Sequence, residues 1–225
     1  MTKKINYLIS FMNRPCDIVV DIGCDHGYLG LTLLKNHDVN LVINIDKKSE
    51  PLQSAIKNLT KYNLKKQTIN LINDGLNDLN LKMKIDYVVI AGLGAQNIIK
   101  ILKKKQANNI KYFLFQPEGN LVVLRRWLFE NNYEILNEGI IKVDEHFYVV
   151  ILCNENKNYQ KAVYGLDDLY LGPILKFWPK NLVFREWVIN QVSKYEKITE
   201  KCQSEKNLSI LRVYYNFLKD ETNQN

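Results

Sequence analysis

Between residues 17 and 152, the sequence alternates short apolar runs with segments of helical periodicity. The apolar runs predict strands at 17–22, 41–46, 68–72, 85–91 and 112–115, and the segments between them predict helices at 28–36, 49–63, 97–105 and 121–131. Strands that alternate with helices form a parallel sheet with helices on both of its faces. We therefore expect an α/β fold built on a parallel sheet.

The end of this region departs from the alternation. Residues 133–143 and 147–153 are two extended apolar runs joined by a short polar turn at Glu145 and His146, which predicts an antiparallel hairpin. Dinucleotide-binding sheets usually end in a parallel strand, whereas the sheet of class I methyltransferases ends in such a hairpin. By this fold-level analogy, we expect a Rossmann-like class I methyltransferase sheet of parallel strands with a final antiparallel hairpin.

The C-terminal part has a different pattern, which predicts two antiparallel helices that turn near residues 203–207. The apolar residues that recur at steps of three or four are Phe184, Val188, Val192, Tyr195, Ile198 and Cys202, followed by Leu208, Leu211, Tyr215 and Leu218. Residues 154–160 are polar and predict a linker. A chain of 225 residues has room for one sizeable core and an appendage. We expect a first domain at 1–153 and a coiled-coil-like helical accessory domain at 160–225.

Composition narrows the function. The chain carries 31 Lys and Arg against 24 Asp and Glu, a net charge of +7, which permits a polyanionic partner without establishing one. Its charge-free stretches, of which 87–99 is the best candidate, are too short to span a membrane. The four cysteines and three histidines lack metal-ligand spacing. We expect a soluble, cytoplasmic monomer that holds no metal.

The strongest site signal is the segment 21–27, DIGCDHG, between the first strand and its helix. Gly23 permits a tight turn there, and we expect Gly27 to bring the helix start close to a ligand. A carboxylate at Asp25 would repel the pyrophosphate of a dinucleotide, and the GK[ST] of a phosphate-binding loop is missing. S-adenosylmethionine carries a sulfonium and an ammonium group and no phosphate. Asp21 and Asp25 would attract it.

Two more carboxylates follow neighbouring strands. Asp46 ends the second strand, near the spacing from Asp21 at which an acid binds ribose hydroxyls. Asp74 and Gly75 follow the third strand, where a carboxylate can accept a hydrogen bond from an adenine amino group. Each residue alone is more often a turn or cap residue. Three acids at consecutive strand ends favour a cofactor site.

The fourth and fifth strands end in groups suited to hold a reacting base. The segment 91–95, AGLGA, exposes backbone groups at the sheet edge, although a plain turn would look the same. The segment 115–120, FQPEGN, offers amide and carbonyl groups to the edge of a base. Arg125 and Arg126 follow, and they suit either phosphate groups or an ion pair with Glu130.

These motifs resemble those of the bacterial tRNA adenine-22 N1-methyltransferase family. The family's DIGSDHAYLP, AGMGG, QPN and LRxWL stand here as DIGCDHGYLG at 21–30, AGLGA at 91–95, QPE at 116–118 and LRRWL at 124–128. A Glu-rich hairpin ending in Tyr stands at 138–148. The departures from the family pattern are Gly30 for Pro, Asp46 for Glu, Ala95 for Gly and Glu118 for Asn.

The resemblance implies transfer of a methyl group from S-adenosylmethionine to N1 of adenine 22 in tRNA, with 1–153 as the methyltransferase domain. The residues expected to contact the cofactor are Asp21, Gly23, Cys24, Asp25, His26, Asp46, Lys47, Asp74, Gly75, Ala91 and Gly92. Those expected to hold the target base are Asp25, Tyr28, Gly92, Leu93, Gln116 and Pro117. Arg125 and Arg126 are expected to contact RNA. The alternatives are methylation of a small molecule or protein, and a cofactor-binding module without catalysis.

Overall fold

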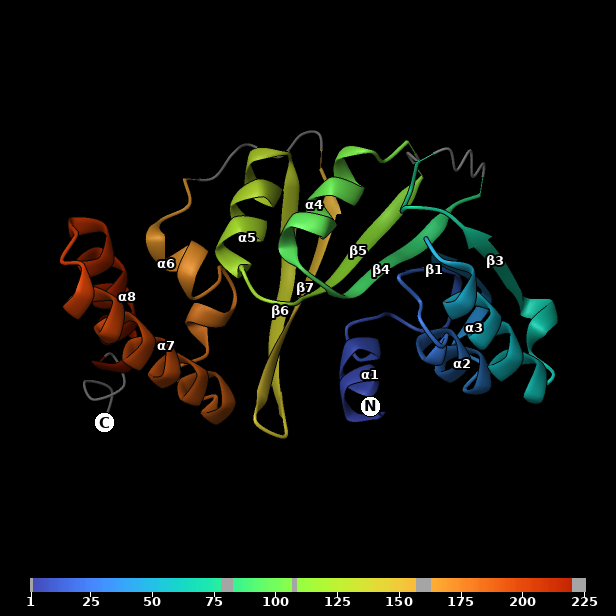
Figure 1. The fold of residues 1–225 in the computed structure, drawn as a ribbon, viewed down its shortest axis with the longest axis horizontal. Coiled ribbons are helices and arrows are strands. Elements are labelled where there is room, and N and C mark those ends of the chain that lie inside the picture. The colour runs from blue at the N-terminus through green and yellow to red at the C-terminus, as the bar shows by residue number, and fades with distance from the viewer. Residues whose placement is uncertain (1, 78–82, 107–108, 157–162, 220–225) are drawn as a thin grey trace.

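The computed structural model describes residues 2–77, 83–106, 109–156 and 163–219, and over these residues seven strands form one sheet (Figure 1). The strands are β1 (Cys16–Ile22), β2 (Val39–Asp46), β3 (Thr68–Ile72), β4 (Ile85–Leu93), β5 (Ile110–Pro117), β6 (Tyr133–Val143) and β7 (His146–Glu155). Their order is β3-β2-β1-β4-β5-β7-β6. The first five are parallel, and β7 runs antiparallel to β5 and β6. The predicted sheet with a final hairpin is confirmed.

Helices cover both faces of this sheet. They are α1 (Thr2–Ile9), α2 (Tyr28–Lys35), α3 (Ser49–Lys61), α4 (Ala95–Lys103), α5 (Leu121–Glu130), α6 (Leu166–Tyr170), α7 (Leu182–Lys201) and α8 (Glu205–Lys219), with single 3-10 turns η1 (Lys65–Gln67) and η2 (Leu175–Phe177). Successive strand side chains point to opposite faces. Accordingly, Val19 of β1 packs in the core with α1, α2 and α3, whereas Val20 packs in the core with α4 and α5.

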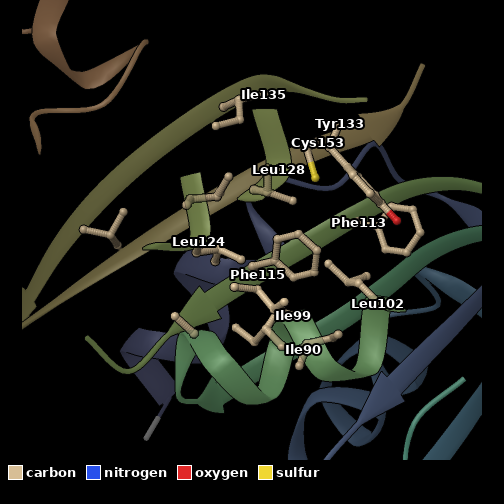
Figure 2. Packing of buried hydrophobic residues seen from close by; sticks show 14 of the residues in the cluster. Ile90, Ile99, Leu102, Phe113, Phe115, Leu124, Leu128, Tyr133, Ile135 and Cys153 are labelled. Carbon is tan, nitrogen blue, oxygen red and sulfur yellow. The ribbon is translucent and has the colours of Figure 1, made fainter. Parts of the chain in front are cut away.

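The core under α4 and α5 is aromatic at its centre. Figure 2 shows Phe113 and Phe115 of β5 between Ile99 and Leu102 of α4 and Leu124 of α5. The two rings stack with their centroids 6.0 Å apart, and neither side chain is exposed. This packing fixes the start of α5 relative to the end of β5, where part of the site lies.

Helix α1 was not predicted from the sequence. It packs on β6 at Gly139, where a Cβ atom would lie 2.4 Å from the Tyr7 hydroxyl and from the Phe11 ring. With a larger residue at this position of β6, the Tyr7 and Phe11 rings would have to move from where they pack. The partners are far apart in the sequence, so local periodicity does not reveal the packing.

The C-terminal arm, defined here as residues 163–219, contains the predicted helical pair. Helix α7 has 20 residues, about 30 Å at 1.5 Å per residue, and α8 runs back along it. The buried face of α7 contains the predicted Phe184, Val188 and Val192. The arm shares the core of the α4–α5 side of the sheet, so its apolar residues continue the main core.

The predicted faces of the arm helices were partly wrong. Helix α8 buries Ile210, Tyr214 and Phe217, whereas the predicted Leu208 and Tyr215 are each 37% exposed and Cys202 is exposed. Eight of the eleven positions in 208–218 are apolar or aromatic, so the sequence allows more than one apolar stripe along this helix. Contacts decide between them, because Phe217 packs on Phe184 with ring centroids 5.1 Å apart and Tyr214 packs on Tyr170 at 6.2 Å.

The hairpin and the linker also differ from prediction at their ends. Asp144 and Glu145 form the turn, with Asp144 in the left-handed region at φ 52°, and His146 already pairs with Val143 in β7. Residues 154 and 155, predicted as linker, are the last residues of β7 and pair with β6. Residues 157–160 of the predicted linker lie outside the described residues.

A buried ion pair joins the arm to the sheet. The Arg125 Nε donates to Glu138 Oε1 at 2.8 Å, and both side chains are 0% exposed. Arg125 also donates to the carbonyl of Leu169, and Glu138 Oε2 accepts from the Ile174 amide at 3.1 Å. The prediction that Arg125 contacts RNA is therefore wrong. Its position on the inner face of α5 turns it toward β6, and its partner is Glu138 rather than Glu130.

Candidate functional site

Two adjoining cavities lie at the carboxyl ends of the parallel strands, where ligands bind in open α/β sheets. The first, of about 170 Å³, is lined by the predicted residues Gly23, Asp46, Lys47, Asp74, Gly75 and Leu93. The second, of about 220 Å³, is lined by the predicted residues Asp21, Gly23, Cys24, Asp25, Tyr28, Ala91, Gly92 and Gln116. Gly23 borders both, so the two cavities together offer room for one elongated ligand. His26 and Pro117 are predicted site residues that line neither cavity.

The turn after β1 is held against the end of β2. Gly23 has φ 73°, a left-handed conformation that favours glycine, and its amide donates to the Ile45 carbonyl at 2.8 Å. The amide of Cys24 donates to the same carbonyl at 3.2 Å. These bonds place the acids of β1 and β2 side by side.

Gly27 has a packing role that the sequence did not indicate. A Cβ atom at this position would lie 2.8 Å from the Cβ of Ala55 in α3, so the glycine allows the start of α2 to approach α3. Gly75 has a similar role, since its Cβ would lie 2.9 Å from the Ile101 side chain of α4. Gly92, in contrast, has φ 76° and no atom within 4 Å of a Cβ placed on it. The backbone at Gly92 is open toward the second cavity.

Asp21 is the most perturbed acid of the site. Its side chain is buried, and burial together with the charge of Asp46 raises the pKa of Asp21 to about 7. A cation beside it would restore its charged form. Asp25 lies exposed at the cavity mouth with φ 50°, and its carboxylate is 3.7 Å from His26 Nε2. The second cavity is therefore suited to a positively charged ligand group.

Two buried amide oxygens at the site have no hydrogen-bond partner among the described residues. Gln116 Nε2 donates to the Pro117 carbonyl at 3.2 Å, which leaves Gln116 Oε1 unpaired beside the second cavity. Asn73 Nδ2 donates to the Asn77 carbonyl at 3.0 Å, which leaves Asn73 Oδ1 unpaired beside the first. An unpaired buried acceptor is costly, so both oxygens indicate ligand groups that donate hydrogen bonds.

Several lining residues were missed by sequence reasoning. Asn97 and Lys100 line the first cavity and lie one turn apart on α4. Two polar residues spaced by three directly after the glycine turn at 92–94 share one face of the helix, and this pattern could have predicted them. Lys4 of α1 lines the second cavity, with its Nζ 3.5 Å from Glu118 Oε1 and 4.3 Å from the centre of the Tyr148 ring. The ion pair with Lys4 accounts for an acid at position 118. No local pattern placed α1 there.

The charges and acceptors of the two cavities fit S-adenosylmethionine. Asp21 and Asp25 suit its ammonium group, Asp46 suits ribose hydroxyls, and Asn73 Oδ1 suits an amino group of adenine. With a sheet that ends in an antiparallel hairpin, these features define a class I S-adenosylmethionine-dependent methyltransferase. Among the described residues, no group of His, Cys, Asp and Glu could hold a metal ion, and no helix is long and apolar enough to cross a membrane.

Comparison with known proteins identifies the family. Residues 19–221 match the TrmK family, tRNA (adenine(22)-N(1))-methyltransferase, and the chain belongs to this family. The predicted activity and cofactor are confirmed by this membership. The Bacillus subtilis tRNA (adenine(22)-N(1))-methyltransferase is 28% identical over 221 residues, which cover 94% of this chain and 91% of the relative.

Solved structures share the whole architecture. M. capricolum TrmK in complex with S-adenosyl-homocysteine superposes with a TM-score of 0.78 at 27% identity, covering 99% of this chain and 96% of that one. The TrmK of B. subtilis superposes with a TM-score of 0.72 at 24% identity, covering 96% and 95%. The superposed residues include the C-terminal arm, for which the sequence offered no family motif.

Proposed function

We propose that this chain holds S-adenosylmethionine across both cavities, its methionine end beside Asp21 and its adenosine end beside Asp46 and Asn73, and methylates N1 of adenine 22 in tRNA. The observation that carries the proposal is the buried Asp21 carboxylate, because a cation is needed to make its charge favourable. Within the proposal, Gly23, Cys24, His26, Lys47, Asp74, Gly75 and Ala91 complete the cofactor site.

The chain's contribution to catalysis is positioning. When bound, S-adenosylmethionine supplies an electrophilic methyl group. N1 of adenine carries an in-plane lone pair, so the protein needs no strong general base and gains most by holding the base in line with the methyl group. Gln116 Oε1, buried and unpaired at the second cavity, accepts a hydrogen bond from the amino group next to N1. The open backbone at Gly92 leaves space for the base, and the next residue, Leu93, pairs with Pro117 of β5.

The target adenine must leave its place in the tRNA fold to reach this cavity. Tyr28, half-buried at the cavity wall, offers a ring on which the extruded base stacks. Its ring centroid is 5.6 Å from that of His26, so the histidine limits how the tyrosine ring turns. Asp25, exposed at the mouth, faces the positive charge that methylation leaves on the base.

The proposal assigns methyl transfer to residues 1–153 and tRNA docking to the helical part, 160–225, in a monomer that works in the cytoplasm. The support for this division is that the two cavities are lined by residues of the first part. Arg126, the second residue predicted to contact RNA, is exposed on α5. It faces the arm, because it lines a further cavity together with residues of α6, α7 and α8.

The decisive test compares two tRNA transcripts. We expect labelled methyl from S-adenosylmethionine to enter an unmodified tRNA with adenine at position 22, and to stay at background when guanine replaces that adenine. Mapping the product to 1-methyladenosine completes the assignment. Equal incorporation into both transcripts would place the target elsewhere, and cofactor binding without incorporation into either would contradict the proposal.

Replacing Gln116 with alanine is expected to lower kcat about 10- to 100-fold, the effect of losing one aligned hydrogen bond to the base. Cofactor affinity, measured by calorimetry, should change little, because Asp21, Asp46 and Asn73 remain. A Gln116→Asn variant keeps the side-chain carbonyl group but places it one methylene farther from the base, and we expect an intermediate kcat. A rate equal to that of the parent enzyme in both variants would show that Gln116 does not touch the base.

A further inference from the structure

A third cavity, of about 590 Å³, lies between the first turn of α5 and the C-terminal arm. We call it the junction groove. One wall is the stretch 119–123 with Arg126, and the other is formed by side chains of α6, α7 and α8. Neither cofactor cavity shares a lining residue with it. The groove is therefore a separate feature that the cofactor does not explain.

The charge of the junction groove is positive. Arg126, Lys194 and Lys206 line it from α5, α7 and α8, and all three are exposed. Within the described part of the chain none of the three makes an ion pair, and no acidic residue lines the groove. Three unpaired cations from three separate helices converge here, although the arm has little net positive charge as a whole. Such a concave surface attracts an anion.

The floor of the junction groove is aromatic. Trp187 and Tyr195 of α7 are half-buried and line it, and the buried Tyr170 and Tyr214 lie behind them. Tyr195 and Tyr214 have ring centroids 5.7 Å apart, and the Trp187 ring meets Tyr214 edge-on at 6.3 Å. These contacts hold the two half-buried rings in place. Fixed aromatic rings beside cations are the combination that binds unpaired nucleotides.

The groove opens close to the reaction site. Gln116 lines the second cavity and Gly119 lines the junction groove, so only two residues of chain lie between these two wall residues. The three residue steps from 116 to 119 span at most about 11 Å. A nucleotide chain whose adenine enters the second cavity would therefore pass the groove with its neighbouring nucleotides.

We propose that the junction groove binds an unpaired nucleotide of the tRNA near the methylated adenine, its phosphates against Arg126, Lys194 and Lys206 and its base on Trp187 and Tyr195. The inference rests on the proposed function and adds the surface that holds the substrate beside the site. Phosphate contacts fix the register of an RNA, and stacking accepts any base. The arm thus binds tRNA through one local groove rather than through its overall charge.

The first test neutralises two of the cations. We expect Lys194→Gln with Lys206→Gln to weaken binding of an unmodified tRNA transcript about tenfold, and to reduce the slope of log affinity against log salt by about 1 to 2, because each lost phosphate contact removes roughly 0.7–0.9. The matched control is Lys65→Gln with Lys66→Gln, two exposed lysines at η1 beside the far edge strand β3. The control should bind tRNA as the parent does. Equal effects of both pairs, or no effect of either, would overturn the proposal.

The second test addresses stacking. Trp187→Leu should weaken tRNA binding roughly tenfold with the salt slope unchanged, and Trp187→Phe should restore most of the affinity. Thermal unfolding and cofactor affinity are measured on each variant, because Trp187 also stacks on Phe184 with centroids 5.6 Å apart. A loss of affinity that tracks the loss of folded protein would contradict stacking, and the lysine pair then decides the proposal alone.

The outcome separates this inference from the proposed function. If the parent enzyme neither binds nor methylates the adenine-22 transcript, the proposed function fails. If the parent methylates it while the groove variants bind it as tightly as the parent, only the groove assignment fails.

Discussion

Replacing Glu138 with glutamine is expected to lower the free energy of unfolding by about 3–5 kcal/mol, the usual result of removing one partner of a buried ion pair. Both Glu138 and Arg125 are fully buried, and glutamine keeps the shape of the side chain while removing its charge. The guanidinium would then stay buried without a counter-charge. Urea denaturation followed by circular dichroism measures the change.

The control for this experiment is Glu145→Gln. Glu145 pairs with Lys142 at 3.4 Å on the surface and is 90% exposed, so we expect no shift of its unfolding midpoint. A double variant, Arg125→Met with Glu138→Leu, removes both charges and should recover much of the lost stability. If Glu138→Gln behaves like the surface control, the pair does not hold the arm to the sheet.

Replacing Asp21 with asparagine is expected to weaken S-adenosylmethionine binding about 10- to 100-fold, because a buried charged contact is worth roughly 1.5–3 kcal/mol. In the parent enzyme, burial raises the pKa of Asp21 to about 7, so affinity should increase as the pH rises from 6 to 8 and the carboxylate loses its proton. In the variant this increase should disappear. Calorimetric titrations at several pH values measure both effects.

The same substitution has an opposite effect on the protein without cofactor. The pKa of Asp21 is higher in the folded chain than in the unfolded chain, so the folded state binds more protons between about pH 4 and 7. This contribution to stability is fully present below pH 4 and is lost as the pH rises through 7. At pH 8, Asp21→Asn should therefore be more stable than the parent, at about 1.4 kcal/mol per unit of pKa difference. Lower stability of the variant at pH 8, with unchanged cofactor affinity, would contradict the role given to Asp21.

Local sequence was sufficient for the elements whose stabilising contacts are close in the chain. The strands of the parallel sheet and the turn at Gly23 were predicted because apolar alternation and a glycine after a strand are local signals. The acids Asp21, Asp46 and Asp74 were placed at one sheet edge because parallel strands end on the same side.

Features that depend on distant partners were missed. Arg125 could not be recognised as buried, because its partners Glu138 and Leu169 lie 13 and 44 residues away. The contact of Gly27 with Ala55 was missed for the same reason. The helix α1, with Lys4, packs on β6 at Gly139, which is distant in the sequence. These residues are defined by the tertiary contacts they make.

The buried pair Arg125–Glu138 also has a consequence for the proposed docking of tRNA in the junction groove. Arg125 lies on α5, whose first turn lines the junction groove, and Glu138 accepts a hydrogen bond from the Ile174 amide of the arm. The two walls of the groove therefore cannot separate without exposing both buried charges. If tRNA docks there as proposed, the docking surface is preorganised, and we expect binding to cost the protein little conformational entropy. The main conformational cost of binding then lies in the RNA, because its target adenine must unstack. We therefore expect tRNAs with a loosely stacked target nucleotide to be the preferred substrates.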